Sequence, residues 1–405
     1  MSLIVQKYGG TSVGDVDRIR NVAKRVIATV KKGHEVVVVV SAMAGETNRL
    51  VALANQASKD PSPREYDQIV STGEQVTIGL LALCLQDLGQ ASASFQGHQV
   101  KILTDSAHSK ARIQKIDAEL ISKSLKEGKV VVVAGFQGMD VDGNVTTLGR
   151  GGSDTTAVAL AAALKADLCE IYTDVDGVYT TDPRICPDAR KLNKISYDEM
   201  LEMASQGAKV LQIRSVEFAA KYHVNLVVRS SFNDNEGTFV VKEDKCMEEV
   251  VVSGVSIDEN EAKVSVRKLP DQPGIAAKIF GPVADSGVNV DMIVQNLSED
   301  GYTDITFTCP QGDLNQARKI IESIHKETNY ARLDADSDIA KVSVIGVGMR
   351  SHSGVAAKVF KTLSSKGINI EMISTSEIRI SVVVRKDKGK DAVRALHEAF
   401  ELHKL

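Results

Sequence analysis

Lys7-Tyr8-Gly9-Gly10-Thr11-Ser12 follows a short apolar run at residues 3–5 and precedes a predicted helix that begins at about Asp15. Glycines let backbone N–H groups approach phosphate oxygens, the N-terminus of a following helix attracts anions, and the lysine adds a full positive charge. The stretch therefore predicts a phosphate-binding loop at the end of a strand. The alternative is a strand-to-helix turn that needs glycine only for its backbone angles.

Up to about residue 245, short β-branched runs alternate with longer helical stretches. The runs at 36–40, 130–133 and 226–228 are apolar without polar alternation, which is typical of strands buried on both faces. The predicted helices span residues 15–32, 73–88, 112–127 and 153–165. The pattern predicts an α/β domain over residues 1–245 with a largely parallel sheet. Ligands bind such sheets at the carboxyl ends of the strands, where the first glycine-rich loop falls.

The C-terminal part of the chain repeats itself. Gly274-Ile-Ala-Ala-Lys-Ile-Phe280 recurs 80 residues later as Gly354-Val-Ala-Ala-Lys-Val-Phe360. Gly287-Val-Asn-Val-Asp-Met-Ile293 recurs with the same offset as Gly367-Ile-Asn-Ile-Glu-Met-Ile373. Two homologous small domains are the natural interpretation of such a repeat.

Each copy is predicted as strand, helix, strand, strand, helix. The first copy ends in a further strand near residues 330–335, which completes a βαββαβ unit, whereas the second copy ends in a helix near the C-terminus. An unassigned strand-like run, residues 250–257, precedes the first copy. We therefore expect the first domain, 262–338, to be inserted in the second, which would comprise 249–258 and 341–405.

Composition argues against several classes of protein. The net charge of -4 is too small for a nucleic-acid or membrane footprint, and 43% hydrophobic with 25% charged residues is ordinary for a soluble globular chain. The longest apolar runs are far shorter than a membrane span, and the N-terminus lacks a signal-peptide pattern. The five scattered cysteines contain no CxxC pair, so we expect reduced thiols with neither a disulfide framework nor a zinc site, and a cytoplasmic location. No metal-binding residue is expected in the chain.

A second glycine-rich stretch, Gly149-Arg150-Gly151-Gly152-Ser153-Asp154, begins another predicted helix. Small residues leave room for a ligand, the helix start favours an anion, and Arg150 suits a carboxylate. Ser153 or Asp154 could equally be a plain N-cap. Two such helix starts in one α/β domain favour phosphate binding over simple turns.

Three further stretches follow predicted strands or begin predicted helices. Residues 173–184 suit the base and ribose of a nucleotide better than calcium, because the twelfth loop position holds Ile185 rather than Glu; a surface turn is the alternative. Residues 71–74 have the spacing of a capping box, which from spacing alone favours a structural role for Glu74. Residues 41–49 follow the strongest strand and would meet substrate. Lys209 by itself is an ordinary surface lysine.

The ordered motifs resemble those of the aspartate kinases of the amino acid kinase superfamily. They are KYGGTS at 7–12, SAMAGETN at 41–48, STGE at 71–74, GRGGSD at 149–154 and TDVDGVYTTDPR at 173–184. The likeness covers nearly the whole chain, and the two repeats resemble ACT domains, which bind small amino acids at paired interfaces. The resemblance implies an α/β fold with an amino acid kinase-type, largely parallel sheet sandwiched by helices, followed by two βαββαβ ACT-like domains.

The resemblance also implies a reaction and its site. The γ-phosphoryl group of ATP would pass to the side-chain carboxylate of L-aspartate, giving 4-phospho-L-aspartate on the way to lysine, threonine and methionine. The implied catalytic residues are Lys7, Asp154, which would orient the lysines, and Lys209. The implied nucleotide contacts are Lys7, Gly9, Gly10, Ser41, Thr173, Asp174, Tyr179, Arg184 and Lys209. The implied aspartate contacts are Thr47, Glu74 for the ammonium, Arg150 for the α-carboxylate, and Ser153.

The residues absent from these motifs agree with such a reaction. None of the eight histidines lies in a candidate catalytic motif, and a substrate carboxylate is already ionised at neutral pH, so no general base is needed. The reaction needs charge neutralisation and in-line placement of two anions. The two lysines, backbone N–H groups and Mg²⁺ bound to the ATP could supply these.

The ACT-like pair implies regulation by lysine, threonine or both. The expected effector contacts are Asp271, Asn289, Asp291, Gln295, Ser374, Thr375 and Glu377. Dimer packing alone is the alternative, and a homo-oligomer through these domains is expected. For the whole chain, a superfamily member that phosphorylates glutamate, acetylglutamate or carbamate is one alternative. A non-catalytic amino-acid sensor is the other, although Lys7, Asp154 and Lys209 together argue against it.

Overall fold

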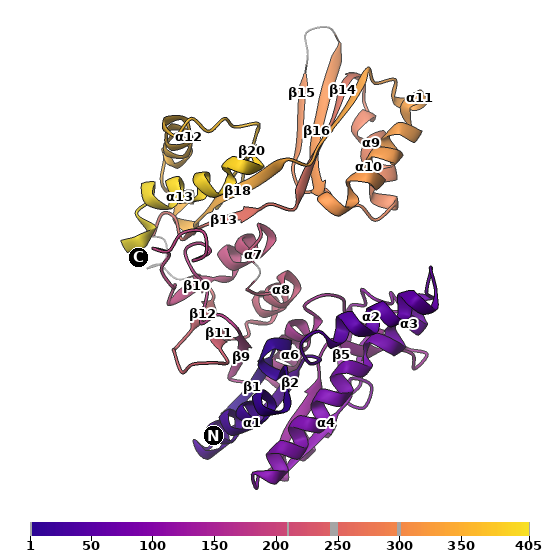
Figure 1. Cartoon of the computed structure of the whole chain (residues 1–405), viewed down its shortest axis with the longest axis vertical. Helices are drawn as coiled ribbons and strands as arrows, with labels where there is room; N and C mark the ends of the chain where they lie inside the picture. The colour runs from indigo at the N-terminus through magenta and orange to yellow at the C-terminus, as the bar shows by residue number, and fades with distance from the viewer. Residues whose placement is uncertain (1, 209, 244–249, 298–300, 405) are drawn as a thin grey trace. The chain divides into compact units, whose positions relative to one another are not determined.

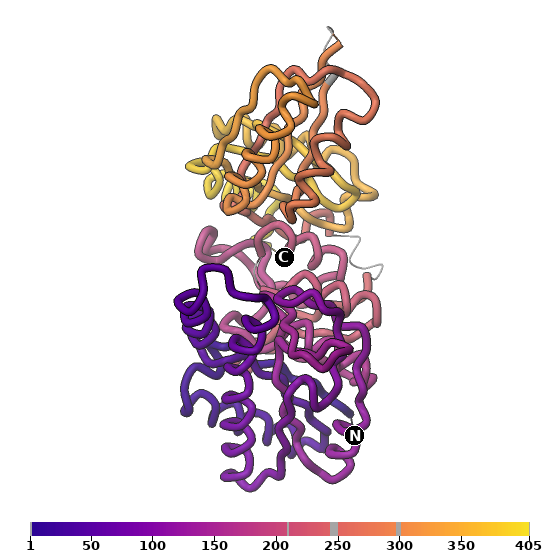
Figure 2. The backbone as a smooth tube through the Cα atoms, turned by 90° about the vertical axis from the view of Figure 1, so that its right-hand side faces the viewer, coloured from indigo at the N-terminus to yellow at the C-terminus, as the bar shows by residue number. Residues whose placement is uncertain are grey.

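The computed structural model describes residues 2–208, 210–243, 250–297 and 301–404 of the 405-residue chain. The chain divides into two compact units, whose segments can be followed in Figure 1 and, as a backbone trace, in Figure 2. The first unit contains Met1–Val178, Lys191–Ala204 and Lys209–Asp244. The second contains Tyr179–Arg190, Ser205–Ala208 and Lys245–Leu405.

An eight-stranded sheet forms the centre of the first unit, with the strand order β10-β12-β11-β9-β1-β2-β6-β3. Its strands are β1 (Leu3–Tyr8), β2 (Glu35–Val40), β3 (Ser92–Phe95), β6 (Val130–Ala134), β9 (Leu168–Thr173), β10 (Lys194–Ser196), β11 (Leu226–Ser230) and β12 (Thr238–Val241). Neighbours run parallel except at β11 and β12. The predicted, largely parallel sheet is therefore confirmed, and the apolar residues 36–40 are at most 1% exposed because both faces are covered.

Helices cover the two faces of this sheet. Tyr8 of β1 packs in one core with α1 (Val16–Lys31) and α4 (Thr72–Asp87), which lie side by side in Figure 1. Since successive side chains of a strand point to opposite faces, Lys7 faces the other side. There it meets Asp154 of α6 (Gly152–Leu164), which packs beside α8 (Ile213–Tyr222). The predicted arrangement of a sheet between helices is present.

The predicted helix over 112–127 is wrong in its first half. β5 (Ile113–Ile116) pairs with β4 (Ile102–Thr104), and helix α5 begins only afterwards (Glu119–Lys126). Asp117 explains the boundary, because its Oδ1 accepts a hydrogen bond from Glu119 N, a local bond that competes with continuous helix. β4 and β5 belong to a small sheet with the order β5-β4-β7-β8, completed by β7 (Gln137–Met139) and β8 (Val145–Thr147).

Within the described residues, one stretch, Pro63–Asp87, is long and apolar enough to cross a membrane by length and composition alone. It contains α3 (Pro63–Val70) and α4, and 56% of its most apolar window is buried inside the protein. Leu81 and Leu85 of α4 are fully buried in the core shared with α1 and β2. The core helix of a globular domain meets the same criterion, and α4 has that role here.

The second unit contains two four-stranded antiparallel sheets of matching topology. The first has the order β15-β16-β14-β17 and the second β13-β18-β20-β19. Their strands are β13 (Gly254–Asp258), β14 (Glu261–Pro270), β15 (Ile293–Leu297), β16 (Tyr302–Pro310), β17 (Arg332–Asp336), β18 (Ile339–Ile345), β19 (Met372–Thr375) and β20 (Arg379–Arg385). β13 precedes the first sheet in the chain yet pairs with β18 of the second, the position expected for the unassigned strand.

Each of these sheets has its own helices. α9 (Ile275–Asp285), α10 (Leu314–Ser323) and α11 (His325–Thr328) accompany the first, while α12 (Val355–Ser365) and α13 (Gly389–Ala399) accompany the second. The repeated glycines Gly274 and Gly354 are the N-caps of α9 and α12, with φ of +90° and +94°. Residues with a side chain rarely adopt this left-handed backbone conformation, so the turn explains why both copies carry glycine.

Candidate functional site

In the first unit, loops from neighbouring strands meet at one edge of the central sheet. The strands β9, β1, β2 and β6 are adjacent and parallel, so their carboxyl ends lie side by side. Ser41 N donates a hydrogen bond to Tyr8 O at 3.1 Å, and Gly135 N donates to Val40 O at 3.0 Å. Each loop is therefore tied to the end of the strand beside it.

Lys7 and Asp154 form an ion pair at this edge. Lys7 Nζ lies 2.6 Å from Asp154 Oδ1, and each side chain is only 11% exposed. A Cβ atom at Gly9 would lie 3.4 Å from Lys7 Nζ, so the ammonium sits directly over the glycine loop. An ammonium with so little access to water needs a partner of opposite charge. Asp154 is that partner, and the ion pair holds Lys7 in position.

The turn interpretation of the first glycine loop is wrong, because the glycines do not have special backbone angles. Gly9 has φ of −75°, and Gly10 is absent from the positive-φ residues. A Cβ at Gly10 would instead lie 3.0 Å from Ala42 O, so glycine is needed for close approach of two loops.

The two helix starts differ in their ability to receive an anion. α1 follows a short 3₁₀ turn (Gly10–Val13), and its N-cap Asp15 accepts a hydrogen bond from Arg18 N at 2.8 Å, so a carboxylate already occupies this helix start. The expectation that the helix after the first loop offers its N-terminus is therefore wrong. The N-cap of α6 is Gly151, which has no capping side chain. Its N-terminus is the one that favours an anion.

Ser153 and Asp154 are consequently not N-caps but lie within the first turn of α6. Ser153 Oγ accepts a hydrogen bond from Ser41 Oγ at 2.9 Å, which brings together two predicted site residues from separate motifs. A Cβ at Gly135 would lie only 2.6 Å from Ser153 Oγ. Sequence analysis missed Gly135, although a glycine directly after the strongly apolar strand β6 was an available signal.

The predicted capping role of Glu74 is wrong. α3 passes into α4 through Ser71 in a helical conformation, and Ser71 makes no side-chain capping bond. Glu74 Oε1 instead accepts a hydrogen bond from Ala42 N at 2.9 Å, in the loop after β2. Its other oxygen has no hydrogen-bond partner within the described part of the chain. Burial raises the pKa of Glu74 to about 7, although the bond from Ala42 N acts to lower it.

Thr47 and Arg150 are more accessible to solvent than Glu74. Thr47 is half-buried in the first turn of α2 (Glu46–Ala57), which begins after Gly45 at φ +81°. Arg150 is exposed between Gly149 and Gly151, both with left-handed φ. Thr47 lies at the start of the helix that follows β2 and Arg150 in the turn that follows β8, where both side chains can meet a ligand.

The residues predicted for the nucleotide fall in different parts of the structure. Thr173 ends β9, and its Oγ1 donates to Asp174 Oδ1 at 3.0 Å within the first unit. Tyr179 and Arg184 belong to the second unit, where Arg184 pairs with the aspartate two residues before it. Lys209 lies outside the described residues.

The segment Tyr179–Arg190 is held within the second unit by α13. His397, which is 1% exposed, lies with Nε2 2.9 Å from Thr180 Oγ1 and Nδ1 3.4 Å from Cys186 Sγ. Arg394 Nε donates to Ile185 O at 3.0 Å. Half of the predicted nucleotide loop is therefore packed against the last helix of the second repeat.

Most of the predicted effector residues are accessible. The exposed ones are Asp271, Asn289, Asp291, Gln295, Thr375 and Glu377, while Ser374 is half-buried. Asp271 N donates a hydrogen bond to Gly301 O at 2.9 Å, and Glu377 lies 3.5 Å from Arg350. Their distribution over β15, β19 and the adjoining loops leaves both repeats with polar surface.

Asp291 differs because its cationic partner is buried. It pairs with Lys341 of the other repeat, which is 1% exposed and also lies 3.2 Å from Glu261. Lys263 pairs in the same way with Glu371. Lys263 and Lys341 are equivalent in the repeats, as are Asp291 and Glu371, so each repeat supplies a lysine to the acid of the other.

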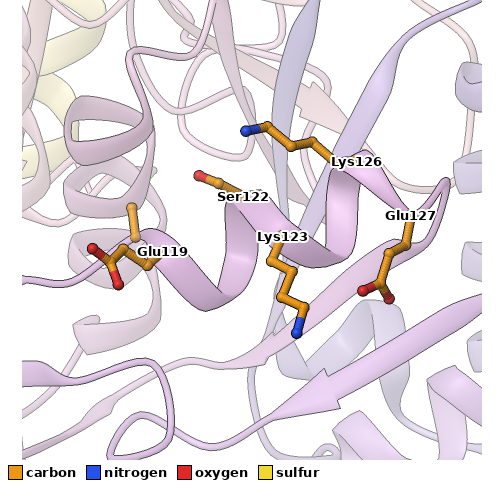
Figure 3. A pocket seen from close by; sticks show the side chains of 6 residues that line it. Glu119, Ser122, Lys123, Lys126 and Glu127 are labelled. Carbon is orange, nitrogen blue, oxygen red and sulfur yellow. The ribbon is translucent and has the colours of Figure 1, made fainter.

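The surface hollow on α5 is unrelated to this site. Ala118, Glu119, Ser122, Lys123, Lys126 and Glu127 line it. In Figure 3, Ser122 and Lys126 point to one side of the helix, and Lys123 and Glu127 to the other. The hollow contains none of the predicted site residues, so we assign it no role.

Comparison with known proteins gives consistent matches along the chain. The amino acid kinase family model matches residues 2–230, and two ACT domain models match residues 264–327 and 342–400. The aspartate kinase of Stutzerimonas stutzeri is 58% identical over 99% of this chain and 98% of its own length. The aspartokinase of Pseudomonas aeruginosa is also 58% identical with the same coverage, and that of Helicobacter pylori is 53% identical over 99% of both chains.

Solved structures agree with these matches. Escherichia coli aspartokinase III in complex with aspartate and ADP superposes with a TM-score of 0.84 at 27% identity, covering 98% of this chain and 99% of that one. The same protein with lysine and aspartate, in its T-state, gives a TM-score of 0.78 at the same identity and coverage. By sequence, domain content and fold, the chain belongs to the aspartate kinases of the amino acid kinase family, with two C-terminal ACT domains.

Proposed function

We propose that the edge formed by β1, β2 and β9 is where this ATP-dependent kinase transfers the γ-phosphoryl group to the side-chain carboxylate of L-aspartate. The observation that carries the proposal is the ion pair of Lys7 with Asp154 over Gly9, next to the uncapped start of α6. An ammonium fixed in this way is preorganised for a transferring phosphoryl group, whose charge is the main barrier to reaction. Gly10 and Ser41 complete the cradle.

The aspartate substrate is proposed to bind between the loop after β2 and the start of α6. Glu74 would receive the ammonium, because its buried Oε2 has no partner among the described residues. Arg150 would grip the α-carboxylate bidentately, and Thr47 and Ser153 would complete the contacts. This arrangement leaves the side-chain carboxylate of the substrate to face the phosphates. Because that carboxylate is already ionised, no residue has to act as a base.

Mg²⁺ is proposed to enter on the phosphates of ATP. The described residues contain no group of three or more His, Cys, Asp or Glu side chains that could hold a metal by themselves, and Asp154 is engaged by Lys7. The ion would neutralise phosphate charge. The chain's own part is then to position the two anions through Lys7, Arg150 and the N-terminus of α6. Thr173, Asp174, Tyr179, Arg184 and Lys209 are proposed to hold the rest of the nucleotide.

The test is aspartate-dependent ADP release by Lys7→Ala. Removal of an interaction made mainly in the transition state should lower kcat much more than it raises KM for either substrate. Glutamate, acetylglutamate and carbamate should give little turnover with the unmodified enzyme. If Lys7→Ala keeps near-normal kcat, the proposed site is wrong.

We further propose that lysine, threonine or both inhibit the enzyme through its ACT domains. The support is the lysine-bound structure of the E. coli relative, together with the accessible polar residues on β15 and β19. The packing of segment Tyr179–Arg190 on α13 offers a route, because an effector that reshapes the repeats would also act on that segment. Titration with each amino acid and with the mixture, followed by turnover and calorimetry, tests this. The absence of both inhibition and binding would refute it.

The domain limits are also a proposal. We assign 1–245 to the kinase domain, 262–338 to the first ACT domain, and 249–258 with 341–405 to the second. The pairing of β13 with β18 supports the inserted arrangement. We likewise propose a homo-oligomer formed through the ACT domains and a cytoplasmic location. Sedimentation of the full chain and of a variant altered on β15 would test the oligomer.

A further inference from the structure

A fully buried carboxylate, Asp67, lies in the first unit outside every motif discussed above. It belongs to α3, and its side chain is 0% exposed. An ionised carboxylate taken out of water is costly unless hydrogen bonds replace the lost hydration. The hydrogen bonds that Asp67 accepts therefore show which segments it holds together.

Asp67 accepts hydrogen bonds from two segments that are distant in sequence. From the loop after β4, Ser109 N donates to Oδ2 at 2.9 Å, Ser109 Oγ to Oδ1 at 3.2 Å, and His108 Nδ1 lies 3.1 Å from Oδ2. From the end of β8, Thr147 N donates to Oδ2 at 2.9 Å and Thr147 Oγ1 to Oδ1 at 2.7 Å. Both carboxylate oxygens are thus used to join these two segments.

The joined segments form the base of the turn that carries Arg150. Thr147 is three residues before Arg150, and Thr147 O accepts a hydrogen bond from Ala111 N at 3.0 Å. A Cβ at Gly149 would lie 3.1 Å from Ser109 O, so the loop held by Asp67 packs directly against the turn. Arg150 itself is exposed, and the frame on which it stands is buried.

A second set of contacts holds the turn from the side of α8. Arg214 donates from Nη1 to Leu148 O at 2.8 Å and from Nη2 to Ala111 O at 2.9 Å. A Cβ at Gly151 would lie 2.2 Å from Gln212 Cγ, so the far side of the turn is also in close contact. The residues on both sides of Arg150 are therefore fixed, and Asp67 is the buried group that joins the loop after β4 to the end of β8.

We propose that Asp67 is a positioning residue for substrate recognition, which holds the Thr147–Arg150 turn so that the guanidinium meets the α-carboxylate of the amino acid substrate. The inference rests on the proposed role of Arg150. A buried carboxylate contributes little to stability compared with an apolar side chain of similar size, so a requirement for geometry accounts better for its presence. A guanidinium displaced by about 1 Å loses much of its effect on a bound carboxylate.

The first experiment measures steady-state kinetics of the full-length Asp67→Asn enzyme. The carboxamide keeps the size of the side chain but places an N–H₂ group where a backbone or hydroxyl donor points. KM for aspartate should rise about tenfold to a hundredfold, while KM for ATP stays within about twofold. Glu199→Gln is the matched control, since Glu199 is 2% exposed and its Oε2 accepts hydrogen bonds from Ser196 N and Oγ, at the end of edge strand β10 and not in the segments that carry the turn. An equal rise in both variants would overturn the proposal.

The second experiment is a double-mutant cycle with Arg150→Ala. If Asp67 acts through Arg150, Asp67→Asn should raise KM for aspartate in the unmodified enzyme and add almost nothing in the Arg150→Ala background. If Asp67→Asn raises KM for aspartate by the same factor in the unmodified enzyme and in Arg150→Ala, the positioning role of Asp67 is wrong, while the proposed role of Arg150 is unaffected. If Arg150→Ala leaves KM for aspartate unchanged, the proposed substrate contact of Arg150 is itself wrong.

A milder pair of variants covers the case in which Asp67→Asn does not fold. Thr147→Val removes the 2.7 Å hydroxyl bond to Asp67 and leaves the backbone bonds in place. Thr147→Ser retains the hydroxyl and should restore KM for aspartate. If Thr147→Val and Thr147→Ser behave alike, with the KM of the unmodified enzyme, the bond has no positioning role and the proposal fails.

Discussion

The buried carboxylate of Glu74 predicts an unusual dependence of aspartate recognition on pH. Burial raises its pKa to about 7, against an ordinary value of 4.5, and the side chain is 2% exposed. Glu74 must be ionised to receive the substrate ammonium as proposed. In the free enzyme, therefore, kcat/KM for aspartate should fall as the pH drops through 7, where the carboxylate takes up a proton.

The size of the effect follows from the pKa. With a pKa of about 7, roughly 90% of Glu74 is ionised at pH 8 and roughly 10% at pH 6. kcat/KM for aspartate should accordingly fall about ninefold over this interval, whereas an ordinary glutamate would give almost no change. Bound ammonium favours the ionised form and lowers the pKa in the complex. At saturating aspartate, kcat should therefore persist to a lower pH than kcat/KM does.

The assay is coupled ADP release at pH 5.5 to 8.5 with saturating ATP and Mg²⁺, so that protonation of the nucleotide does not enter. Glu74→Gln, which cannot ionise, should bind aspartate poorly and show a flat profile over the same range. A kcat/KM for aspartate that is constant from pH 8 to pH 6 in the unmodified enzyme would refute the reasoning. A profile equally steep in Glu74→Gln would assign the titration to another group.

Three further predictions concern activity and stability. Lys7→Ala should lower kcat by about 10²-fold to 10³-fold with an unchanged circular dichroism spectrum, and a loss of less than about tenfold would exclude a transition-state role. Glu74→Gln should change the pH dependence of stability. Between pH 4.5 and pH 7, Glu74 keeps its proton in the folded enzyme but loses it in the unfolded chain. The unfolding free energy of the unmodified enzyme should therefore fall by up to about 3 kcal/mol as the pH rises from 4.5 to 7. Glu74→Gln should lack this decline. If the melting temperatures of the unmodified enzyme and of the variant change equally between pH 5 and pH 8, the prediction is wrong. Lys341→Met should destabilise the second unit by roughly 3 kcal/mol, because Glu261 and Asp291 lose their buried partner; an unchanged melting temperature would show that water compensates them.

The fold could be predicted from sequence wherever a local pattern decided it. The continuous valines of β2 indicated a strand covered on both faces, and the repeats at Gly274 and Gly354 indicated two similar domains. The first signal is a run of adjacent residues and the second is a short stretch that recurs 80 residues later, so both can be read without the tertiary structure. The helix predicted over 112–127 was wrong in its first half because Ile113 and Ile116 pair with β4, a partner that a local pattern does not identify.

Some residues of the candidate site could likewise be identified from sequence, whereas the roles of others depended on the tertiary structure. Lys7, Gly9 and Asp154 were identified by motif, and the structure brings them together. Whether Glu74 caps its own helix or reaches Ala42 depended on how α4 packs against the loop after β2. The choice between two helix starts depended on the capping side chain of Asp15.

The sequence by itself therefore determined the alternation of strands and helices around the parallel sheet, the repeated domains and the motif residues that carry charge. Only the tertiary structure decided which of those charges are buried, which partners they meet and which buried groups hold them. Asp67 is the clearest case, since its donors lie about 40 and 80 residues away in the chain. The physical reason is that desolvation and hydrogen-bond partners depend on neighbours in space, and no local pattern records them.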